Sequence, residues 1–200
     1  MLTERLCRLM KTISMTRICV FAGSGSGVID DYAETASELG QALASHGCSL
    51  VYGGANIGVM GVLADAVLAG GGEVTGVMPA FLVDREVAHQ GLTQLRVVDS
   101  MHERKGVMLE LSDGVIAFPG GLGTLDELFE ALTWAQLGLH QKPCGLLNVA
   151  GYFNHLLAFL DHAVDQGFVA AEHRVMLACE ADAGTLLDCL RRQIGRTFEK

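Results

Sequence analysis

Three glycines, a threonine and a glutamate stand close together in residues 118–127, which read FPGGLGTLDE. An apolar run stops at Pro119, and Thr124 precedes Glu127 by three positions. Glycine lets backbone N–H groups approach a ligand closely, and a helix that begins behind them adds a partial positive charge. The stretch therefore predicts a phosphate cradle, with Thr124 able to add its hydroxyl.

The same spacing also has a purely structural interpretation. Thr124 at an N-cap and Glu127 three residues later would form a capping box. Ser100 and Glu103 stand at the same spacing. For Glu103 the capping interpretation is favoured. For Glu127 capping and chemistry both remain open, because a glycine cradle directly precedes it.

Two cations follow the second of these candidate caps. Arg104 and Lys105 are either solvated helix charges or ligand contacts. Arg104 falls near the first turn of its expected helix, where the helix dipole opposes a cation. This unfavourable placement indicates that an anionic group lies nearby.

Other glycine-rich loops follow apolar runs at residues 22–27 (AGSGSG) and 52–58 (YGGANIG). Neither has the Gly-x-Gly-x-x-Gly spacing of a dinucleotide site, and the second lacks the acid that such a site carries for the ribose hydroxyls. No Gly-Lys-Ser/Thr loop is present. A mononucleotide or a sugar phosphate fits these loops better. The hydroxyl of Ser24 either binds such a ligand or closes a turn.

Short apolar runs alternate with helical periods along the chain. Strands are expected at 17–23, 48–54, 73–79, 95–100, 114–120 and 143–148, and helices at 31–47 and 58–72. A short strand and a last helix are expected within residues 178–194, and a loop at residues 80–91. Uniformly apolar strands separated by helices predict one doubly wound α/β fold, a mostly parallel sheet with helices on both faces. Such sheets bind ligands at the carboxyl ends of their strands, where the strand order reverses.

Composition narrows the possible functions. The length of 200 residues favours one domain, here 16–200, preceded by an N-terminal extension of residues 1–15 with no assigned function. The net charge of −9 argues against a nucleic-acid partner, and no apolar run is long enough to span a membrane. Six scattered cysteines predict buried thiols in a reducing, cytoplasmic setting, and no His/Cys spacing predicts a metal site.

Two motifs taken together resemble a known family. PGGLGTLDE (119–127) and MHERK (101–105) are similar to the paired motifs of the "lonely guy" cytokinin riboside 5′-monophosphate phosphoribohydrolases, many of which were once labelled lysine decarboxylases. The resemblance runs from about Arg17 to about Phe168. It implies a Rossmann-like fold, a homodimer with sites near the subunit interface, and hydrolysis of AMP or an N6-modified AMP to free base and ribose 5-phosphate without a cofactor.

The resemblance also implies roles for individual residues. Arg104 and Glu127 match the catalytic positions. Glutamate would activate the attacking water and stabilise positive charge on the sugar, and arginine would act electrostatically. Positions expected to bind the substrate or its phosphate are Glu86, Lys105, Gly120, Gly121, Leu122, Gly123, Thr124 and Thr133, together with Gly23, Ser24 and Gly54 from the other glycine loops.

Alternative functions remain open at this point. The same fold could serve as a non-enzymatic nucleotide carrier or sensor, although the presence of both Arg104 and Glu127 counts against it. A lysine decarboxylase would need a lysine for pyridoxal phosphate. Of Lys11, Lys105, Lys142 and Lys200, only Lys105 is expected near the site. The sequence leaves the preferred base open.

Overall fold

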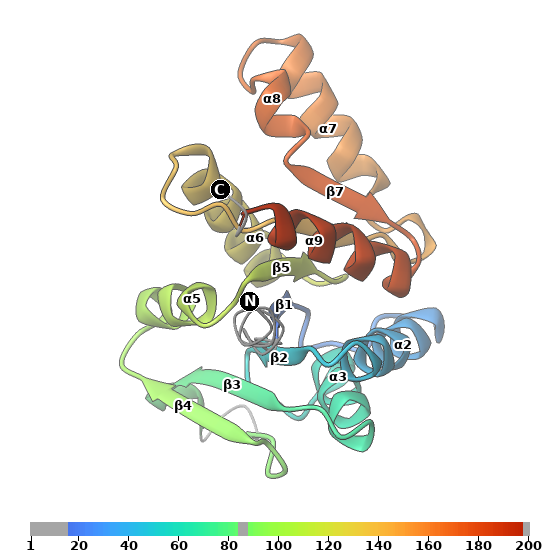
Figure 1. The fold of residues 1–200 in the computed structure, drawn as a ribbon, viewed down its shortest axis with the longest axis vertical. Helices are drawn as coiled ribbons and strands as arrows, with labels where there is room; N and C mark the ends of the chain where they lie inside the picture. The colour runs from blue at the N-terminus through green and yellow to red at the C-terminus, as the bar shows by residue number, and fades with distance from the viewer. Residues whose placement is uncertain (1–15, 84–87, 198–200) are drawn as a thin grey trace, which may run out of the picture.

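The computed structural model describes residues 16–83 and 88–197. These residues form a seven-stranded sheet in the order β4-β3-β2-β1-β5-β6-β7, and every pairing is parallel (Figure 1). The strands are β1 (Arg17–Phe21), β2 (Ser49–Tyr52), β3 (Val74–Pro79), β4 (Gln94–Val98), β5 (Gly114–Ala117), β6 (Cys144–Leu147) and β7 (Leu177–Glu180). The expected doubly wound α/β fold is confirmed.

Helices cover both faces of the sheet (Figure 1). Their bounds are α2 (Asp31–Ser45), α3 (Gly58–Ala69), α4 (Ala80–Val83), α5 (Met101–Glu110), α6 (Leu122–Gln136), the 3₁₀ helix η1 (Val149–Gly151), α7 (Asn154–Asp165), α8 (Ala171–Arg174) and α9 (Ala183–Thr197). One core packs the sheet against α2, α3 and α9, and the other packs it against α5, α6 and α7.

Successive side chains of a strand alternate between the two cores. In β1, Ile18 and Val20 belong to the first core, whereas Cys19 and Phe21 belong to the second. Successive side chains of a strand point to opposite faces, so a strand buried on both sides reads as continuously apolar. This is why the sheet was predictable from short apolar runs. Burying each such aliphatic or aromatic side chain contributes about 1.5–3 kcal/mol.

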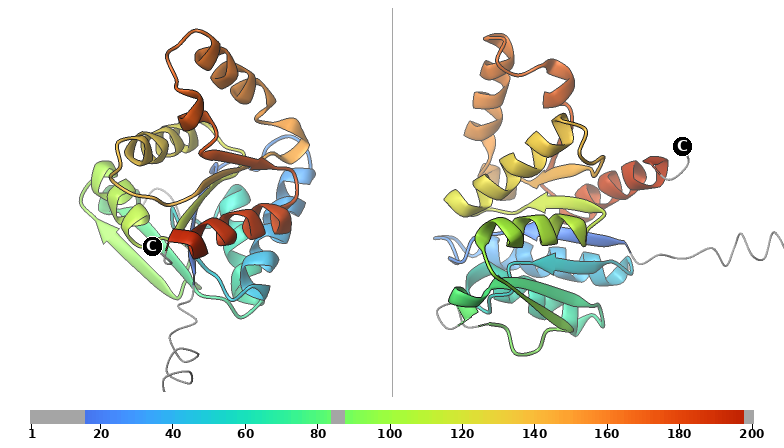
Figure 2. Two further views of the ribbon diagram at one scale, coloured as in Figure 1. Left: turned by 45° about the horizontal axis from the view of Figure 1, so that its top comes forward. Right: turned by 90° about the vertical axis from the view of Figure 1, so that its left-hand side faces the viewer.

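The strand order reverses between β1 and β5, which are adjacent although almost a hundred residues separate them. From β1 the chain builds β2, β3 and β4 on one side, and then it returns to build β5, β6 and β7 on the other. Figure 2 shows the resulting layers from two further directions. The loops that follow β1 and β5 therefore meet at the reversal point, and these are the loops with the glycines.

One expectation about the fold is wrong in part. Residues 80–91 were expected to form a loop, but Ala80–Val83 forms the short helix α4 directly after β3. Further along, Ala88 pairs with Ala55 in an isolated antiparallel bridge. A four-residue helix is only one turn, too short for an amphipathic period to appear in the sequence. Residues 1–15, and Glu86 with its neighbours 84–87, lie outside the described residues.

The expected burial holds for three of the five cysteines that the structure describes, while Cys179 and Cys189 are half-buried. Cys19, Cys48 and Cys144 are buried, and burial raises the pKa of each thiol, that of Cys144 to about 12. These thiols are therefore neutral in the core and act as small apolar side chains. None of the helices within 16–83 and 88–197 is both long enough and apolar enough for a membrane crossing.

Candidate active site

A hollow of about 320 Å³ lies where the loops after β1 and β5 meet. Its lining comes mostly from glycine loops: Gly23, Ser24, Gly25, Ser26, Gly27, Pro119, Gly120 and Gly121, with Tyr32, Val59 and Tyr152 at its sides. The two loops touch directly, since Gly23 N–H donates to the Pro119 carbonyl at 3.3 Å. A Cβ on Gly23 would stand 2.9 Å from Gly120 Cα, so the contact requires glycine.

Backbone groups dominate the electrostatics of this hollow. None of its lining residues carries a charged side chain. Three helices begin beside it, because Tyr32, Val59 and Gly121 stand at the first turns of α2, α3 and α6. The N–H groups of a first helical turn have no partner within the helix, and the dipole favours an anion there. The hollow is therefore suited to a phosphate held by backbone N–H groups.

Three glycines of these loops are not explained by the packing of the protein. For Gly25, Gly121 and Gly123, no described atom beyond the adjoining backbone lies within 4 Å of where a Cβ would stand. None of the three has a positive φ. A side chain at these positions would extend into open space, where it would meet a ligand that approaches the backbone. Their position supports the expected cradle.

Arg104 and Glu127 come together from different helices. Arg104 lies on α5 and Glu127 on α6, and Nη1 of the guanidinium stands 3.7 Å from Oε1 of the carboxylate. Their side chains are only 11% and 8% exposed. The anion that the placement of Arg104 predicted is thus, at least in part, a carboxylate of the same chain.

The ends of two strands fix the guanidinium. Arg104 Nε donates to the Val77 carbonyl of β3 at 3.1 Å. A Cβ on Gly53, which directly follows β2, would collide with Arg104 Nη2. The guanidinium therefore occupies space that only glycine leaves free, and its plane is fixed against the carboxyl ends of β2 and β3.

Burial determines the chemistry of Glu127. Removal from water raises the pKa of this carboxyl to about 7, although the Arg104 guanidinium opposes the rise. A carboxyl with a pKa near 7 is partly ionised at neutral pH and can both take and return a proton. This is the range in which a general base works efficiently.

Lys105 is engaged with carboxylates in the structure. Its ammonium stands 3.0 Å from Asp126 Oδ2 and 3.0 Å from Glu130 Oε2, both on α6. Although burial lowers the pKa of Lys105, its hydrogen bonds to Glu130 and Asp126 raise it on balance. Substrate binding by Lys105 stays a prediction from the resemblance, and it would compete with these two contacts.

The two capping predictions have different outcomes. The Ser100 hydroxyl accepts from Glu103 N–H at 3.1 Å, so the cap at α5 is confirmed, and the Glu103 carboxylate accepts from Asp99 N–H at 2.8 Å. The cap at Thr124 is wrong. Helix α6 already begins at Leu122 with Gly121 as its N-cap, and Glu127 lies beyond the first turn. Thr124 is buried with its hydroxyl against Gly120.

The remaining predicted residues lie in different places. Leu122 is 88% exposed at the start of α6. Gly54 does not line the hollow. It has a φ of +87° and packs close to Gly76 of β3, which explains its glycine structurally. Thr133 lines a separate hollow of about 190 Å³ formed by α6, α7, α8 and β7, and its hydroxyl donates to the Phe129 carbonyl.

Sequence reasoning missed several residues around the site. Tyr32 and Tyr152 line the hollow with their rings edge to face, and Gly53 makes room for Arg104. Tyr152 follows the expected strand at 143–148, so its place after a carboxyl strand end was a usable signal. His89 is buried, and its Nε2 stands 2.9 Å from Asp65 Oδ1 while its Nδ1 accepts from Gly91 N–H.

Neither lysine in the described part of the chain is placed to carry pyridoxal phosphate in the hollow. Lys105 contacts its two carboxylates, and Lys142 donates to the carbonyls of Leu109 and Ser112 at the end of α5. Among residues 16–83 and 88–197, no three His, Cys, Asp or Glu side chains form a group that could hold a metal ion.

Comparisons with known proteins identify relatives of this chain. A family profile described as "Possible lysine decarboxylase" matches residues 60–190. The chain is 47% identical over 180 residues to the cytokinin riboside 5′-monophosphate phosphoribohydrolase LOG1 of Arabidopsis thaliana, which covers 90% of this chain and 84% of that protein. It is likewise 47% identical to LOG7 of the same plant, over 86% of this chain and 79% of that protein.

Among solved structures, the molybdenum cofactor carrier protein of Chlamydomonas reinhardtii superposes with a TM-score of 0.70. The match covers 90% of this chain and 99% of that one at 23% identity, which supports the fold alone. The profile match and the identities to the plant enzymes go further. They show that the chain belongs to the family, historically described as possible lysine decarboxylases, that contains the LOG cytokinin riboside 5′-monophosphate phosphoribohydrolases.

Proposed function

We propose that this protein hydrolyses the N-glycosidic bond of a nucleoside 5′-monophosphate, either AMP or an N6-modified AMP, to free base and ribose 5-phosphate. The observation that carries the proposal is the buried contact of Arg104 with Glu127. Family membership supports the same reaction, since the relatives are named as phosphoribohydrolases.

In this mechanism the phosphate occupies the hollow between the glycine loops. Backbone N–H groups of Gly121 and its neighbours at the start of α6 would hold it, since no charged side chain lines the hollow. The phosphate is remote from the carbon that reacts, so its binding energy serves to position the ribose.

Glu127 would then act at the anomeric carbon. Breaking the bond to the base builds positive charge on the sugar, which an ionised carboxylate stabilises. Glu127 takes a proton from the attacking water as the new C–O bond forms, and the departing base takes up one proton, so one water is consumed overall. A base of this kind contributes about 10²–10⁴-fold to the rate.

Arg104 would work electrostatically. A guanidinium holds its proton too strongly to be a good proton donor. Its contact keeps Glu127 oriented and favours the ionised carboxylate, and its fixed charge can stabilise electron density on the departing base. The hydrogen bond to Val77 and the close fit to Gly53 hold it for this role.

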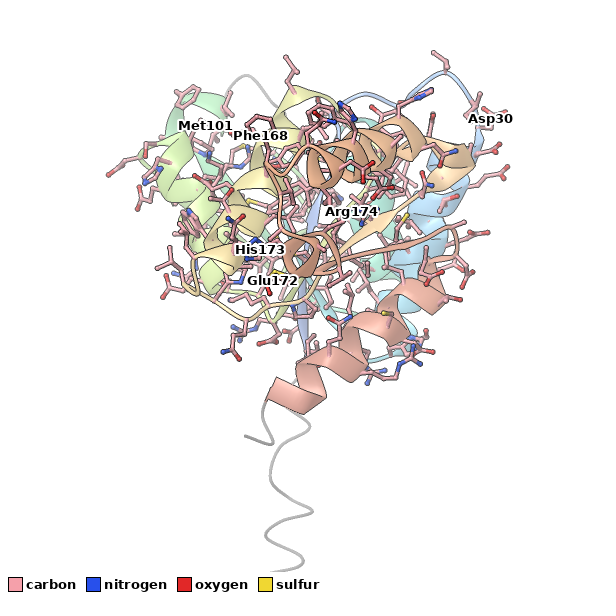
Figure 3. All side chains as sticks on the ribbon, turned by 90° about the horizontal axis from the view of Figure 1, so that it is seen from above. Asp30, Met101, Phe168, Glu172, His173 and Arg174 are labelled. Carbon is pink, nitrogen blue, oxygen red and sulfur yellow. The ribbon has the colours of Figure 1, made fainter. Side chains whose placement is uncertain are left out.

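We also infer that two copies of the chain form the working unit. Large apolar side chains are exposed on α6 and around α7 and α8: Phe129, Phe159, Phe168 and Val175. The α7–α8 region extends away from the sheet (Figure 1), and Figure 3 labels Phe168 together with Glu172, His173 and Arg174 in this region. Light scattering on the purified protein should give twice the mass of one chain; the mass of a single chain would contradict this inference.

A panel of possible substrates tests the reaction. Purified protein is incubated with AMP, an isopentenylated AMP, adenosine and ATP, and the free base is separated by chromatography. We expect base release from the monophosphates and kcat/KM at least about a hundredfold lower for adenosine, which lacks the group that the hollow holds. Binding of AMP without any base release would point to a carrier or sensor and would contradict hydrolysis.

A further inference from the structure

A tyrosine from a distant part of the chain contacts the glycine loop of the cradle. Tyr152 directly follows the turn η1, and its hydroxyl donates to the Gly120 carbonyl at 2.6 Å, across 32 residues of sequence. The ring is 43% exposed and lines the hollow. The cradle thus has a side-chain support that neither glycine motif contains.

This hydrogen bond determines where a backbone donor points. A trans peptide is planar, so its C=O and N–H point in opposite directions. With the Gly120 carbonyl held by Tyr152, the N–H of Gly121 is directed away from that tyrosine. The preceding peptide is held in the same way, because the Pro119 carbonyl accepts from Gly23 N–H at 3.3 Å. Two successive peptides, and with them two successive N–H groups, are therefore fixed before any ligand arrives.

The turn that presents Tyr152 is itself firmly anchored. Val149 is buried in one core of the sheet and Phe153 in the other. The side chain of Asn148 accepts from Phe153 N–H at 2.7 Å and donates to Asn154 Oδ1 at 2.8 Å. Tyr152 is thus held between two buried neighbours, with only its own ring directed to the hollow.

The backbone of this turn is unusual. Ala150 has a φ of +48°, the only positive φ of a non-glycine residue in the described chain, and Gly151 follows at +73°. Such a conformation is strained for alanine, whose Cβ then approaches the following carbonyl oxygen. Strain of this kind persists where the surrounding structure enforces it, and it is concentrated at functional sites. Here it turns the chain so that residue 152 reaches the cradle.

We propose that Tyr152 is a positioning residue for the 5′-phosphate: by holding the Gly120 carbonyl, it directs the Gly121 N–H group into the cradle. The inference rests on the proposed function in placing a phosphate there, and it adds a determinant of phosphate affinity outside the glycine motifs. It predicts that the tyrosine hydroxyl affects binding of the phosphate end of the substrate and leaves the chemical step unchanged.

The test removes one oxygen atom. Tyr152→Phe keeps the ring and its edge contact with Tyr32, but it releases the Gly120 carbonyl. Tyr52→Phe is the matched control, since the Tyr52 hydroxyl also donates to a backbone carbonyl, that of Ala55, yet lies buried away from the hollow. Calorimetric titration with ribose 5-phosphate measures affinity without any turnover, and steady-state kinetics with AMP separates KM from kcat.

We expect Tyr152→Phe to weaken ribose 5-phosphate binding and to raise KM for AMP about three- to tenfold, with kcat within about twofold of wild type. Tyr52→Phe should lower the melting temperature without changing the affinity. Unchanged affinity in Tyr152→Phe, an equal loss in Tyr52→Phe, or a loss confined to kcat would overturn the inference.

If wild type binds ribose 5-phosphate but cleaves no AMP, the proposed reaction fails while this titration still decides the role of Tyr152. If wild type does not bind ribose 5-phosphate, the inference about Tyr152 is contradicted, while base release from AMP still decides the proposed reaction.

Discussion

Two adjacent cations of α5, Arg104 and Lys105, contact carboxylates of α6. Arg104 meets Glu127 at 3.7 Å, while Lys105 meets Asp126 and Glu130 at 3.0 Å. The two cations are similarly covered, with side chains 11% and 14% exposed. The acids differ: Glu127 is 8% exposed, against 64% for Asp126 and 20% for Glu130. The shorter distances are therefore those from Lys105, whose partner acids have more access to water.

The comparison shows that burial of the acid, and not the length of the ion pair, prepares a group for chemistry. Burial raises the pKa of Glu127 to about 7 in spite of the neighbouring guanidinium. An exposed ion pair contributes little, because water and salt screen it. A one-residue shift along each helix thus separates a contact suited to proton transfer from contacts that join two helices through acids with more access to water.

Among changes to the two cations, Arg104→Ala should have the larger effect. It leaves the Glu127 carboxylate buried without its cation, and loss of one such electrostatic group lowers kcat by about 10²–10³-fold. Because Arg104 lowers the pKa of Glu127, its removal should also shift the pH profile upward. The measurement is base release from AMP. Arg96→Ala, an exposed arginine on β4, is the control. Turnover in Arg104→Ala equal to that of the control would remove Arg104 from the mechanism.

The pH dependence of kcat/KM measures the ionisation of the buried Glu127 carboxyl directly. Glu127 must be ionised to take a proton, so kcat/KM should fall about tenfold per pH unit below about 7 and level off above it. Stability should show the opposite sign. The folded-state pKa lies above the ordinary value of 4.5, so the folded state binds more protons than the unfolded state between these two values. The contribution of Glu127 to stability is complete below about 4.5 and is lost as pH rises through 7. A flat rate profile from pH 5 to 8 would contradict the assignment.

Lys105→Met should have the smallest effect. It removes the contacts with Asp126 and Glu130 but keeps an unbranched side chain of similar length. We expect the free energy of unfolding to change by less than about 1 kcal/mol. KM for AMP should rise less than about tenfold, as for the loss of one hydrogen bond. Chemical denaturation and steady-state kinetics measure the two quantities. An activity loss as large as that of Arg104→Ala would show that Lys105 and its partner acids are part of the reacting centre.

The sequence predicted the scaffold well, because each strand is buried on both faces and therefore appears as an apolar run that ends in glycine. It also predicted the meeting of Arg104 with Glu127, through the resemblance and through the placement of a cation near a helix start. The cap at Thr124 was misplaced because Gly121 already begins the helix. The hydrogen bond from the Tyr152 hydroxyl to Gly120 could not be predicted from local sequence patterns, because it depends on how two distant loops pack.

The role of Gly53 shows the same limit. Its sequence context suggested a ligand loop, whereas the structure uses its missing side chain to seat the Arg104 guanidinium. Hydrophobic periodicity and the spacing of motif residues indicate which residues face the core and which lie at the end of a strand. They do not report which distant side chain fills the space beside a glycine.

Glu127→Gln is the decisive variant, because it shows whether the buried Glu127 carboxylate is needed for cleavage. Glutamine keeps the shape of the side chain but loses the negative charge and the ability to accept a proton. The rate at which free base appears from AMP is measured for wild type and variant at equal concentration, with melting curves to show that both are folded. We expect equimolar base and ribose 5-phosphate from wild type and a rate lower by about 10²–10⁴-fold in the folded variant. Base release at the wild-type rate by folded Glu127→Gln would contradict the account.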